Sequence, residues 1–275
     1  MLKADYNRAV ALCKESIDGG FDLTVAHAAE ANVPFVAVQS LRRQMFSRHI
    51  KKMDWRCKQP GSIDEFLNQY REGMKIVDIA RQPGLRYSPY LMARILVGAL
   101  LPDIKVAKTM QSPSLIADDR LRGEVEQCLS EDMDYSPHLD RVRRGLGAEY
   151  EFILQQKLRA RGVAFESESD LREKGAYKTP DMLLQIPFAV KGPKQEWVVV
   201  AWIDSKAMFG DEHTYVKEHQ SQLLSYVNRY GPGLVIYWFG FVETLLSPTF
   251  EGYRKDIMVM ADFPSPIMLP DGQIL

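Results

Sequence analysis

The chain has 275 residues, enough to bury one large hydrophobic core or two modest ones, and we expect two domains. Its 35 basic residues balance its 36 acidic residues, which excludes a protein that coats nucleic acid through bulk positive charge and confines any nucleic-acid surface to a local patch. Three scattered cysteines and the lack of an apolar run near the ~18 residues of a membrane span favour a soluble intracellular protein without disulfides, zinc module or membrane contact.

Residues 4–100 predict a series of short helices. Two short helices, a break at Pro34 and a basic third helix from Phe35 to about Lys52 suggest a helix-turn-helix-like unit. The third helix carries the candidate nucleic-acid-binding residues, which are Arg42, Arg43, Arg48, Lys51 and Lys52. The alternative interpretation is that these charges form the solvated face of a helix in a bundle.

The middle of the helical region contains two similar helix starts. Residues 51–61 are expected to form a basic linker before them. In Ser88-Pro89 and in Ser136-Pro137, the Ser is the expected N-cap and the Pro the first helical residue. These starts arise either from an internal duplication or independently. Between them, residues 105–119 are the most loop-like stretch of the chain.

The pattern changes near residue 141, which divides the chain into a helical region, residues 1–140, and a second domain, residues 141–275. There, an amphipathic helix ends at Gly162, and apolar runs bounded by turn residues indicate strands that are buried on both faces. The expected order after residue 141 is helix, strand, strand, strand, helix, strand, with the central strands over residues 182–190 and 197–203. This order predicts an α/β domain with a mixed sheet between helices.

Charged residues appear where these two central strands end. Asp204 and Lys206 are two residues apart on one strand, so their side chains point the same way. If the two strands pair, Asp181 faces Asp204 across a short gap. Two carboxylates and an ammonium at the end of a buried sheet predict a site for a hard divalent cation.

These residues also match a known arrangement. Pro180-Asp181, the triplet Asp204-Ser205-Lys206 and Glu151 in the preceding helix together resemble the PD-(D/E)XK nuclease superfamily. Gln222 and Tyr226 are similar to the Gln-x-x-x-Tyr helix motif of its RecB-like members. The resemblance implies a restriction-endonuclease-like αβββαβ core.

A narrower resemblance is to the TPD-motif family within that superfamily. It rests on Thr179-Pro180-Asp181, on the turn at residues 209–212 and on the run of residues 228–238. The likeness covers most of residues 145–241 and continues more loosely into the helical half. An animal member of this family is named for a protein partner, codanin, so the resemblance implies a codanin-like partner and residence in nucleus and cytoplasm.

The resemblance also implies a role for each site residue. Asp181 and Asp204 would hold Mg²⁺ or Mn²⁺, and the backbone carbonyl of Ser205 and the side chain of Glu151 would complete the oxygen ligands. Lys206 would orient or deprotonate the attacking water and stabilise the developing negative charge. Gln222 and Tyr226, four residues apart on one helical face, would position a phosphate or a metal-bound water.

Some assignments near the site stay open. Glu149 competes with Glu151 as the carboxylate of the helix. Asp211 either caps the following helix or binds metal. His213 and His219 lack a partner at ligand spacing and are expected to be exposed.

The function expected from these observations is divalent-metal-dependent hydrolysis of phosphodiester bonds, with DNA favoured and RNA or branched structures left open. A catalytically silent scaffold that binds nucleic acid or protein is the first alternative. A transcription regulator led by the N-terminal helices, with the second domain as a ligand sensor, is another. The oligomeric state is left open.

Overall fold

The computed structural model describes the backbone of residues 1–275 and the side chains of residues 1–137 and 139–275. The chain forms two compact units. The sheet unit consists of Met1–Ala9, Val25–Leu41 and Arg144–Leu275, and the helical unit consists of Val10–Thr24 and Arg42–Arg143. The long stretch of the sheet unit begins at Arg144, and the unit also includes two N-terminal segments.

Helices make up the N-terminal half, as the sequence predicts. They are α1 (Lys3–Gly19), α2 (Val25–Glu30), α3 (Phe35–Cys57), α4 (Pro60–Arg71), α5 (Ile76–Arg81), α6 (Pro89–Leu100), α7 (Val106–Gln111), the 3₁₀ turn η1 (Pro113–Leu115) and α8 (Asp119–Glu131). Helices α1 and α3 have residues in both units.

Two segments that were expected to be irregular are helical. The predicted linker at residues 51–61 belongs mostly to α3, because Ile50, Met53 and Cys57 recur at helical spacing and bury a continuous apolar stripe. The predicted loop at residues 105–119 contains α7, which buries Met110 in the same core. Both helices were not predicted because polar residues between the apolar ones make the local composition resemble that of a loop.

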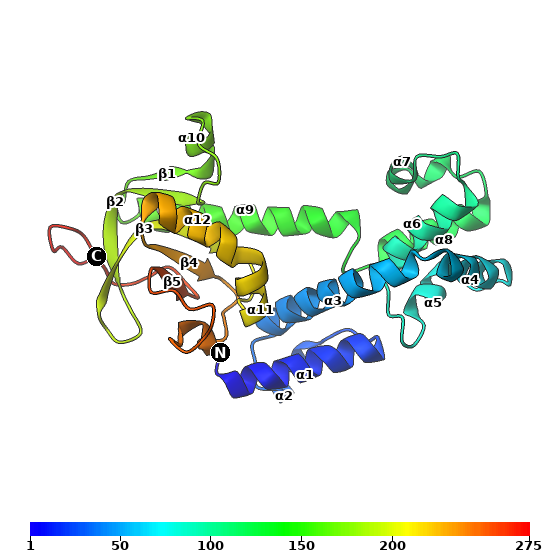
Figure 1. Ribbon diagram of the computed structural model, residues 1–275, viewed down its shortest axis with the longest axis horizontal. Helices are drawn as coiled ribbons and strands as arrows, with labels where there is room; N and C mark the ends of the chain where they lie inside the picture. The colour runs from blue at the N-terminus through cyan, green and yellow to red at the C-terminus, as the bar shows by residue number, and fades with distance from the viewer. The chain divides into compact units, whose positions relative to one another are not determined.

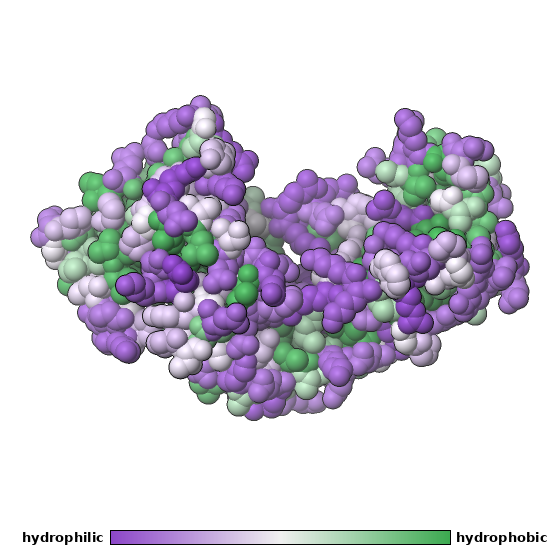
Figure 2. Space-filling model, viewed as in Figure 1, coloured by the Kyte–Doolittle hydropathy of each residue, from purple (hydrophilic) through white to green (hydrophobic). Residues whose placement is uncertain are grey.

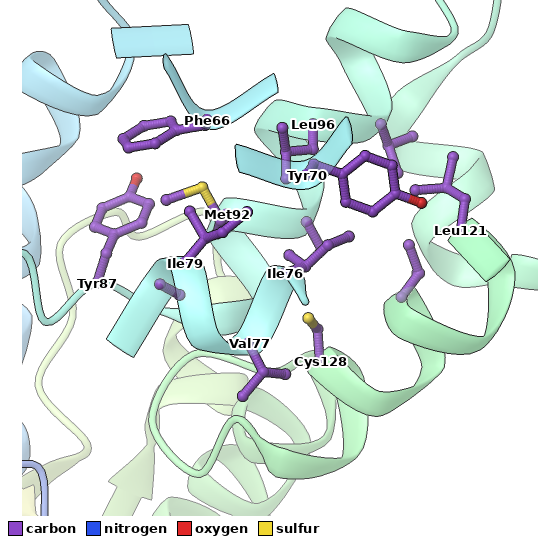
Figure 3. Close-up of a cluster of buried hydrophobic side chains, with 14 of the residues drawn as sticks. Phe66, Tyr70, Ile76, Val77, Ile79, Tyr87, Met92, Leu96, Leu121 and Cys128 are labelled. Carbon is purple, nitrogen blue, oxygen red and sulfur yellow. The ribbon is translucent and has the colours of Figure 1, made fainter. Parts of the chain in front are cut away.

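The helical unit has its own hydrophobic core. Figure 3 shows large side chains from α4, α5, α6 and α8 that converge on this core, among them Tyr70, Ile79, Met92 and Leu121. The predicted cap of α6 is present, since the hydroxyl of Ser88 accepts a hydrogen bond from the backbone N–H of Leu91.

The sheet unit contains a mixed sheet. Its elements are α9 (Pro137–Arg159, beginning in the helical unit), β1 (Phe165–Ser167), α10 (Glu168–Glu173), β2 (Met182–Lys191), β3 (Trp197–Lys206), α11 (Glu212–Thr214), the π-helical turn η2 (Tyr215–His219), α12 (Gln220–Tyr230), β4 (Gly233–Tyr237), the 3₁₀ turn η3 (Glu243–Leu246), β5 (Ile257–Met260) and β6 (Ile267–Met268). The strand order is β1-β2-β3-β4-β5, and β6 pairs with β2. Strands β1 to β3 are antiparallel, and β3, β4 and β5 are parallel, which confirms the predicted mixed sheet.

Helices pack against the sheet through alternate residues of its strands. In β3, Ile203 contributes to the core cluster that contains Leu154 and Leu158 of α9. Its neighbour Trp202 contacts Tyr226 of α12 edge to face, with ring centroids 5.3 Å apart. Figure 1 shows α12 beside β3 in the sheet unit. Because side chains alternate along a strand, α9 and α12 serve different sides of β3, and Asp204 and Lys206 share the side of Trp202.

The packing of Trp202 on the α12 side of the sheet depends on one glycine. Gly233 begins β4 and pairs with Trp202. A Cβ atom at residue 233 would lie 2.0 Å from the Trp202 ring, far inside van der Waals contact. Only glycine therefore allows this indole to lie flat against β4.

The central part of β2 departs from the prediction of burial on both faces. Residues Gln185, Ile186 and Pro187 are exposed, and the pairing of β2 with β3 shifts between Leu183 and Phe188. Pro187 has no N–H to give to the ladder, so its position at this irregularity is explained. The continuous apolar run concealed a β-bulge.

The N-terminal segments of the sheet unit contact the turn that follows β3. Tyr6 stacks on Phe209, with centroids 6.2 Å apart. Lys3 forms an ion pair with Glu212, and the hydroxyl of Ser40 accepts a hydrogen bond of 2.9 Å from the backbone N–H of Phe209. Residues 1–9 and 25–41 thus support the loop that leaves the end of β3.

Hydrophilic side chains cover much of the face of each unit that Figure 2 shows, with apolar residues scattered among them. Among the described residues, no helix combines the length and apolar character that crossing a membrane would need.

Candidate active site

The ends of β2 and β3 bring two carboxylates together. Met182 pairs with Ile203 in the antiparallel ladder, so Asp181, just before β2, lies opposite Asp204. The backbone N–H of Ser205 donates a hydrogen bond of 2.6 Å to Asp181 Oδ2 and holds this carboxylate against β3. The pairing on which the predicted site depends is therefore present.

Lys206 contacts one of these carboxylates. Its Nζ atom lies 2.6 Å from Asp204 Oδ2, with the Asp204 side chain 1% exposed and the Lys206 side chain 17% exposed. The contact is an ion pair at the distance of a charge-assisted hydrogen bond, and this bond to Asp204 contributes to the raised pKa of Lys206. This buried carboxylate oxygen keeps unused capacity to accept a donor or a cation.

The electrostatics of the site reflect an excess of negative charge. Burial raises the pKa of Asp181 well above its ordinary value, and the carboxylate of Asp204 raises it further. The pKa of Glu151 is raised by burial and then by Glu168 and Asp204. Burial lowers the pKa of Lys206, but Asp204 and Asp181 outweigh this effect, so the pKa of the ammonium is raised. Lys206 therefore keeps its proton while it faces the two carboxylates.

Helix α12 supplies the next contacts. Gln222 Oε1 accepts a long hydrogen bond of 3.4 Å from Lys206 Nζ, and Gln222 Nε2 donates to the hydroxyl of Tyr226 at 2.7 Å. Tyr226 is buried against Trp202, and burial raises its pKa. The structure thus brings both predicted α12 residues to the same side of β3 as Asp204 and Lys206, with Gln222 as the link.

Helix α9 approaches the site from another side. Glu151 is half-buried and its charge raises the pKa of Asp181, whereas Glu149 is exposed. The neighbouring Tyr150 contacts Trp238, with ring centroids 5.1 Å apart. Trp238 Nε1 in turn donates a hydrogen bond of 2.8 Å to Ser205 Oγ. This aromatic contact connects α9 to the triplet of β3.

The sequence did not reveal the buried pair His219 and Tyr237. His219, expected at the surface, is buried, and its Nδ1 lies 2.7 Å from the hydroxyl of Tyr237, the residue that pairs with Lys206 across β3 and β4. Burial lowers the pKa of His219 to about 3, with a smaller contribution from the charge of Lys206. The sequence does contain a signal for this burial. His219 lies four residues after Tyr215 and four before Leu223, so it shares a helical face with two large apolar side chains, and all three are buried.

Asp211 caps the helix that follows β3. It is buried, and its side chain accepts a hydrogen bond of 2.7 Å from the backbone N–H of Thr214. This contact corresponds to the capping alternative of the sequence analysis.

The predicted nucleic-acid-binding residues all belong to the helical unit. Arg42 is half-buried, forms an ion pair with Asp134 at 3.0 Å and donates a hydrogen bond of 2.8 Å to Ser16 Oγ. Arg43 is also half-buried, and burial lowers its pKa. Lys51 and Lys52 are exposed, and Arg48 is half-buried. Only the two lysines present their charges openly to solvent.

The donor set can be compared with the needs of a divalent cation. Among the described residues, no three His, Cys, Asp or Glu side chains converge in a position to hold a metal ion. Asp181 and Asp204 nevertheless offer two adjacent carboxylates, and Lys206 Nζ lies 2.6 Å from the buried Oδ2 of Asp204. Oxygen donors of this kind suit Mg²⁺ or Mn²⁺ rather than zinc or copper.

Comparison with known proteins adds independent information. A profile described as "Protein of unknown function TPD sequence-motif" matches residues 117–263. The protein named CDAN1-interacting nuclease 1 of Mus musculus is 35% identical over 244 residues, which cover 83% of each chain. Its namesake of Homo sapiens is 34% identical with the same coverage, and that of Danio rerio is 36% identical over 78% of this chain and 74% of its own.

No solved structure matches the chain significantly. The profile covers about half of the chain, including α9, the sheet up to β5 and every predicted site residue from Glu151 to Tyr226. The animal proteins extend the similarity into the helical half. The chain therefore belongs to the TPD sequence-motif family, together with the animal proteins named CDAN1-interacting nuclease 1.

Proposed function

We propose that this protein is a divalent-metal-dependent nuclease that hydrolyses phosphodiester bonds, with DNA as the favoured substrate. The observation that carries the proposal is the meeting of Asp181, Asp204 and Lys206 at the paired ends of β2 and β3. The names of the relatives support the reaction class, since each is called a nuclease. The element order around the site supports membership of the PD-(D/E)XK superfamily.

Asp181 and Asp204 would hold Mg²⁺ or Mn²⁺, with the carbonyl of Ser205 and the side chain of Glu151 as further oxygen donors. A cation between the two aspartates would relieve the repulsion that raises the pKa of Asp181. When bound, the cation would neutralise phosphate charge and lower the pKa of a coordinated water.

Side chains of the protein would supply the other contributions to catalysis. Lys206 keeps its proton beside Asp204, so it is suited to stabilise the charge that develops on the phosphate. Gln222 holds Lys206 and is itself held by Tyr226, which limits the directions in which the ammonium can point. A fixed ammonium contributes more to catalysis than a mobile one because it needs no reorganisation during the reaction.

The experiment that tests this function is a cleavage assay on labelled single-stranded, duplex, flap and four-way DNA and on single-stranded RNA. Each substrate is incubated with Mg²⁺, with Mn²⁺ or with a chelator. The wild-type protein is compared with Asp204→Ala and Lys206→Ala. Metal-dependent cutting that both substitutions abolish supports the nuclease; binding without cutting, unchanged by either substitution, refutes it.

A protein-binding role is a second candidate, because the relatives are named for interaction with CDAN1. We infer a partner of that kind for this chain, with the nuclease fold as a scaffold if no cleavage is found. Purification of the tagged chain from its own cells, followed by identification of a CDAN1-like protein, would test this inference. Loss of the partner in Asp204→Ala would argue against a role independent of the active site.

A further inference from the structure

An exposed aromatic ring lies in the loop that leads into β2. The side chain of Tyr177 is 70% exposed, although it is a large ring four residues before Asp181. The guanidinium of Arg229 lies over this ring, 4.6 Å from its centroid, and donates a hydrogen bond to the backbone carbonyl of Tyr177. The ring is thus held in place by a cation while most of its surface stays open to solvent.

Arg229 continues the functional face of α12. Gln222, Tyr226 and Arg229 follow one another at intervals of four and three residues, so their side chains emerge on one side of the helix. Gln222, at one end of this row, contacts Lys206. Seven residues of helix separate Gln222 from Arg229, or about 10 Å, which is roughly three nucleotide steps along a stacked strand.

The loop adds a second cation in an unusual conformation. Lys178 is exposed and has a φ of 51°, in the left-handed backbone region that residues other than glycine seldom adopt. The next two residues, Thr179 and Pro180, are buried and lead directly to Asp181. Unfavourable backbone conformations of this kind are concentrated at functional sites.

The charges of this patch are available for a ligand. Among the described residues, no carboxylate forms an ion pair with Arg229 or with Lys178. An exposed ring with open π surface, a guanidinium stacked on it and a neighbouring ammonium match the parts of a single strand, an unpaired base and its phosphates. A duplex keeps its bases stacked inside and offers the ring no base face.

We propose that Tyr177, Lys178 and Arg229 form a contact site for an unpaired nucleotide about three steps from the scissile phosphate. Tyr177 stacks on the base, and Lys178 and Arg229 contact phosphates. The proposal rests on the proposed nuclease function and specifies its substrate as a strand with a single-stranded segment beside the cleavage point. It also assigns the grip on that segment to the sheet unit.

Binding can be measured separately from cleavage. Fluorescence anisotropy in the presence of a chelator, which prevents metal-dependent cutting, gives the affinity of the full chain for labelled single-stranded DNA, single-stranded RNA and blunt duplex DNA. The variants are Tyr177→Leu, Tyr177→Phe, Lys178→Gln and Arg229→Gln. The matched controls are Trp197→Leu and Lys191→Gln, a second ring and cation in contact at 4.1 Å. That pair lies at the opposite end of β2 and β3, about 30 Å away by strand length.

The expected result differs for each kind of residue. Tyr177→Leu weakens single-strand binding about 5- to 100-fold and leaves duplex binding unchanged, whereas Tyr177→Phe retains the wild-type affinity. Lys178→Gln and Arg229→Gln each reduce the slope of log affinity against log salt by about 0.7, the value for one phosphate of a single strand. A merely structural residue would not change this slope. Thermal melting identifies any variant that fails to fold. If Arg229→Gln unfolds, Lys178→Gln still tests the proposal, because the Lys178 side chain forms no ion pair or hydrogen bond within the described residues.

Three results would overturn the proposal: Tyr177→Leu with unchanged single-strand affinity, equal losses in the control variants, or equal losses for duplex and single strand. Its failure is distinct from that of the nuclease function. Metal-dependent cleavage with unaltered binding by Tyr177→Leu removes this site and keeps the nuclease. Binding through Tyr177 without cleavage of any substrate keeps the site and removes the nuclease.

Discussion

Asp181 lies directly opposite Asp204 across the antiparallel ends of β2 and β3, and the backbone N–H of Ser205 fixes it there. Burial and then the charge of Asp204 raise the pKa of Asp181, because two carboxylates that share a buried strand end are poorly solvated and repel one another. The pair therefore destabilises the metal-free protein. Functional sites commonly carry such a cost.

Asp181→Asn is expected to stabilise the metal-free protein by about 1 kcal/mol, a rise of a few degrees in Tm, because the amide removes one charge and still accepts the Ser205 hydrogen bond. The rise in Tm that Mg²⁺ or Mn²⁺ gives the wild type should disappear in this variant. Thermal melting with chelator and with metal measures both effects. Glu149→Gln, which neutralises an exposed acid on α9, is the control and should change neither value. A lower Tm for Asp181→Asn in chelator would contradict the account.

His219 gives a prediction about pH. Its pKa is lowered from 6.5 to about 3 in the folded protein, so the unfolded chain binds a proton more readily. Stability is therefore lost as the pH falls below about 6.5, and the loss reaches about 2 kcal/mol at pH 5. His219→Gln removes this contribution. Urea unfolding at pH 7.5 and at pH 5 should show a smaller acid destabilisation for His219→Gln than for the wild type; equal losses would show that His219 is not buried as described.

Gly233→Ala should destabilise the protein by about 3 kcal/mol or more, because the added Cβ would lie 2.0 Å from the Trp202 ring and would displace it from Tyr226. Gly123→Ala is the matched control, since Gly123 lies within α8 and its added Cβ would meet nothing within 4 Å. That substitution should stabilise the protein by about 1 kcal/mol. Urea titration of both variants measures the difference, and a neutral Gly233→Ala would contradict the described packing of Trp202.

The ion pair between Arg42 and Asp134 predicts a structural role for this arginine. The side chains are only 15% and 12% exposed, so Asp134→Asn leaves a poorly solvated guanidinium and should cost about 2 kcal/mol. Glu131→Gln, in the pair with Arg81 whose side chains are 50% and 35% exposed, should cost less than about 1 kcal/mol. Chemical unfolding distinguishes the two. Equal effects would mean that Arg42 is free to contact other ligands, as the nucleic-acid prediction requires.

The sequence predicted the parts of the site that depend on local geometry. Strand periodicity places Asp204 and Lys206 on one face, and helix periodicity does the same for Gln222 and Tyr226. The resemblance to the PD-(D/E)XK superfamily supplied their order and the surrounding elements, and the comparisons confirm the narrower resemblance to the TPD-motif family.

The features that the sequence did not predict depend on contacts between segments that are distant in the chain. The burial of His219 follows from its contact with Tyr237, and the pairing of Arg42 joins residues 92 positions apart. The hydrogen bond from Phe209 to Ser40, which supports the turn after β3, joins residues 169 positions apart. Local patterns carry no information on such pairs, so polar residues that packing buries were expected at the surface.

The most direct measurement of the central claim is the rate of cleavage of a labelled DNA strand with a single-stranded segment, compared between wild type and Asp204→Asn. The account predicts cleavage by the wild type that starts when Mg²⁺ or Mn²⁺ is added and stops with chelator, and a loss of at least about 100-fold in Asp204→Asn, as expected when a metal ligand and the partner of Lys206 are removed together. Cleavage that persists in chelator, or that Asp204→Asn retains in full, would contradict it.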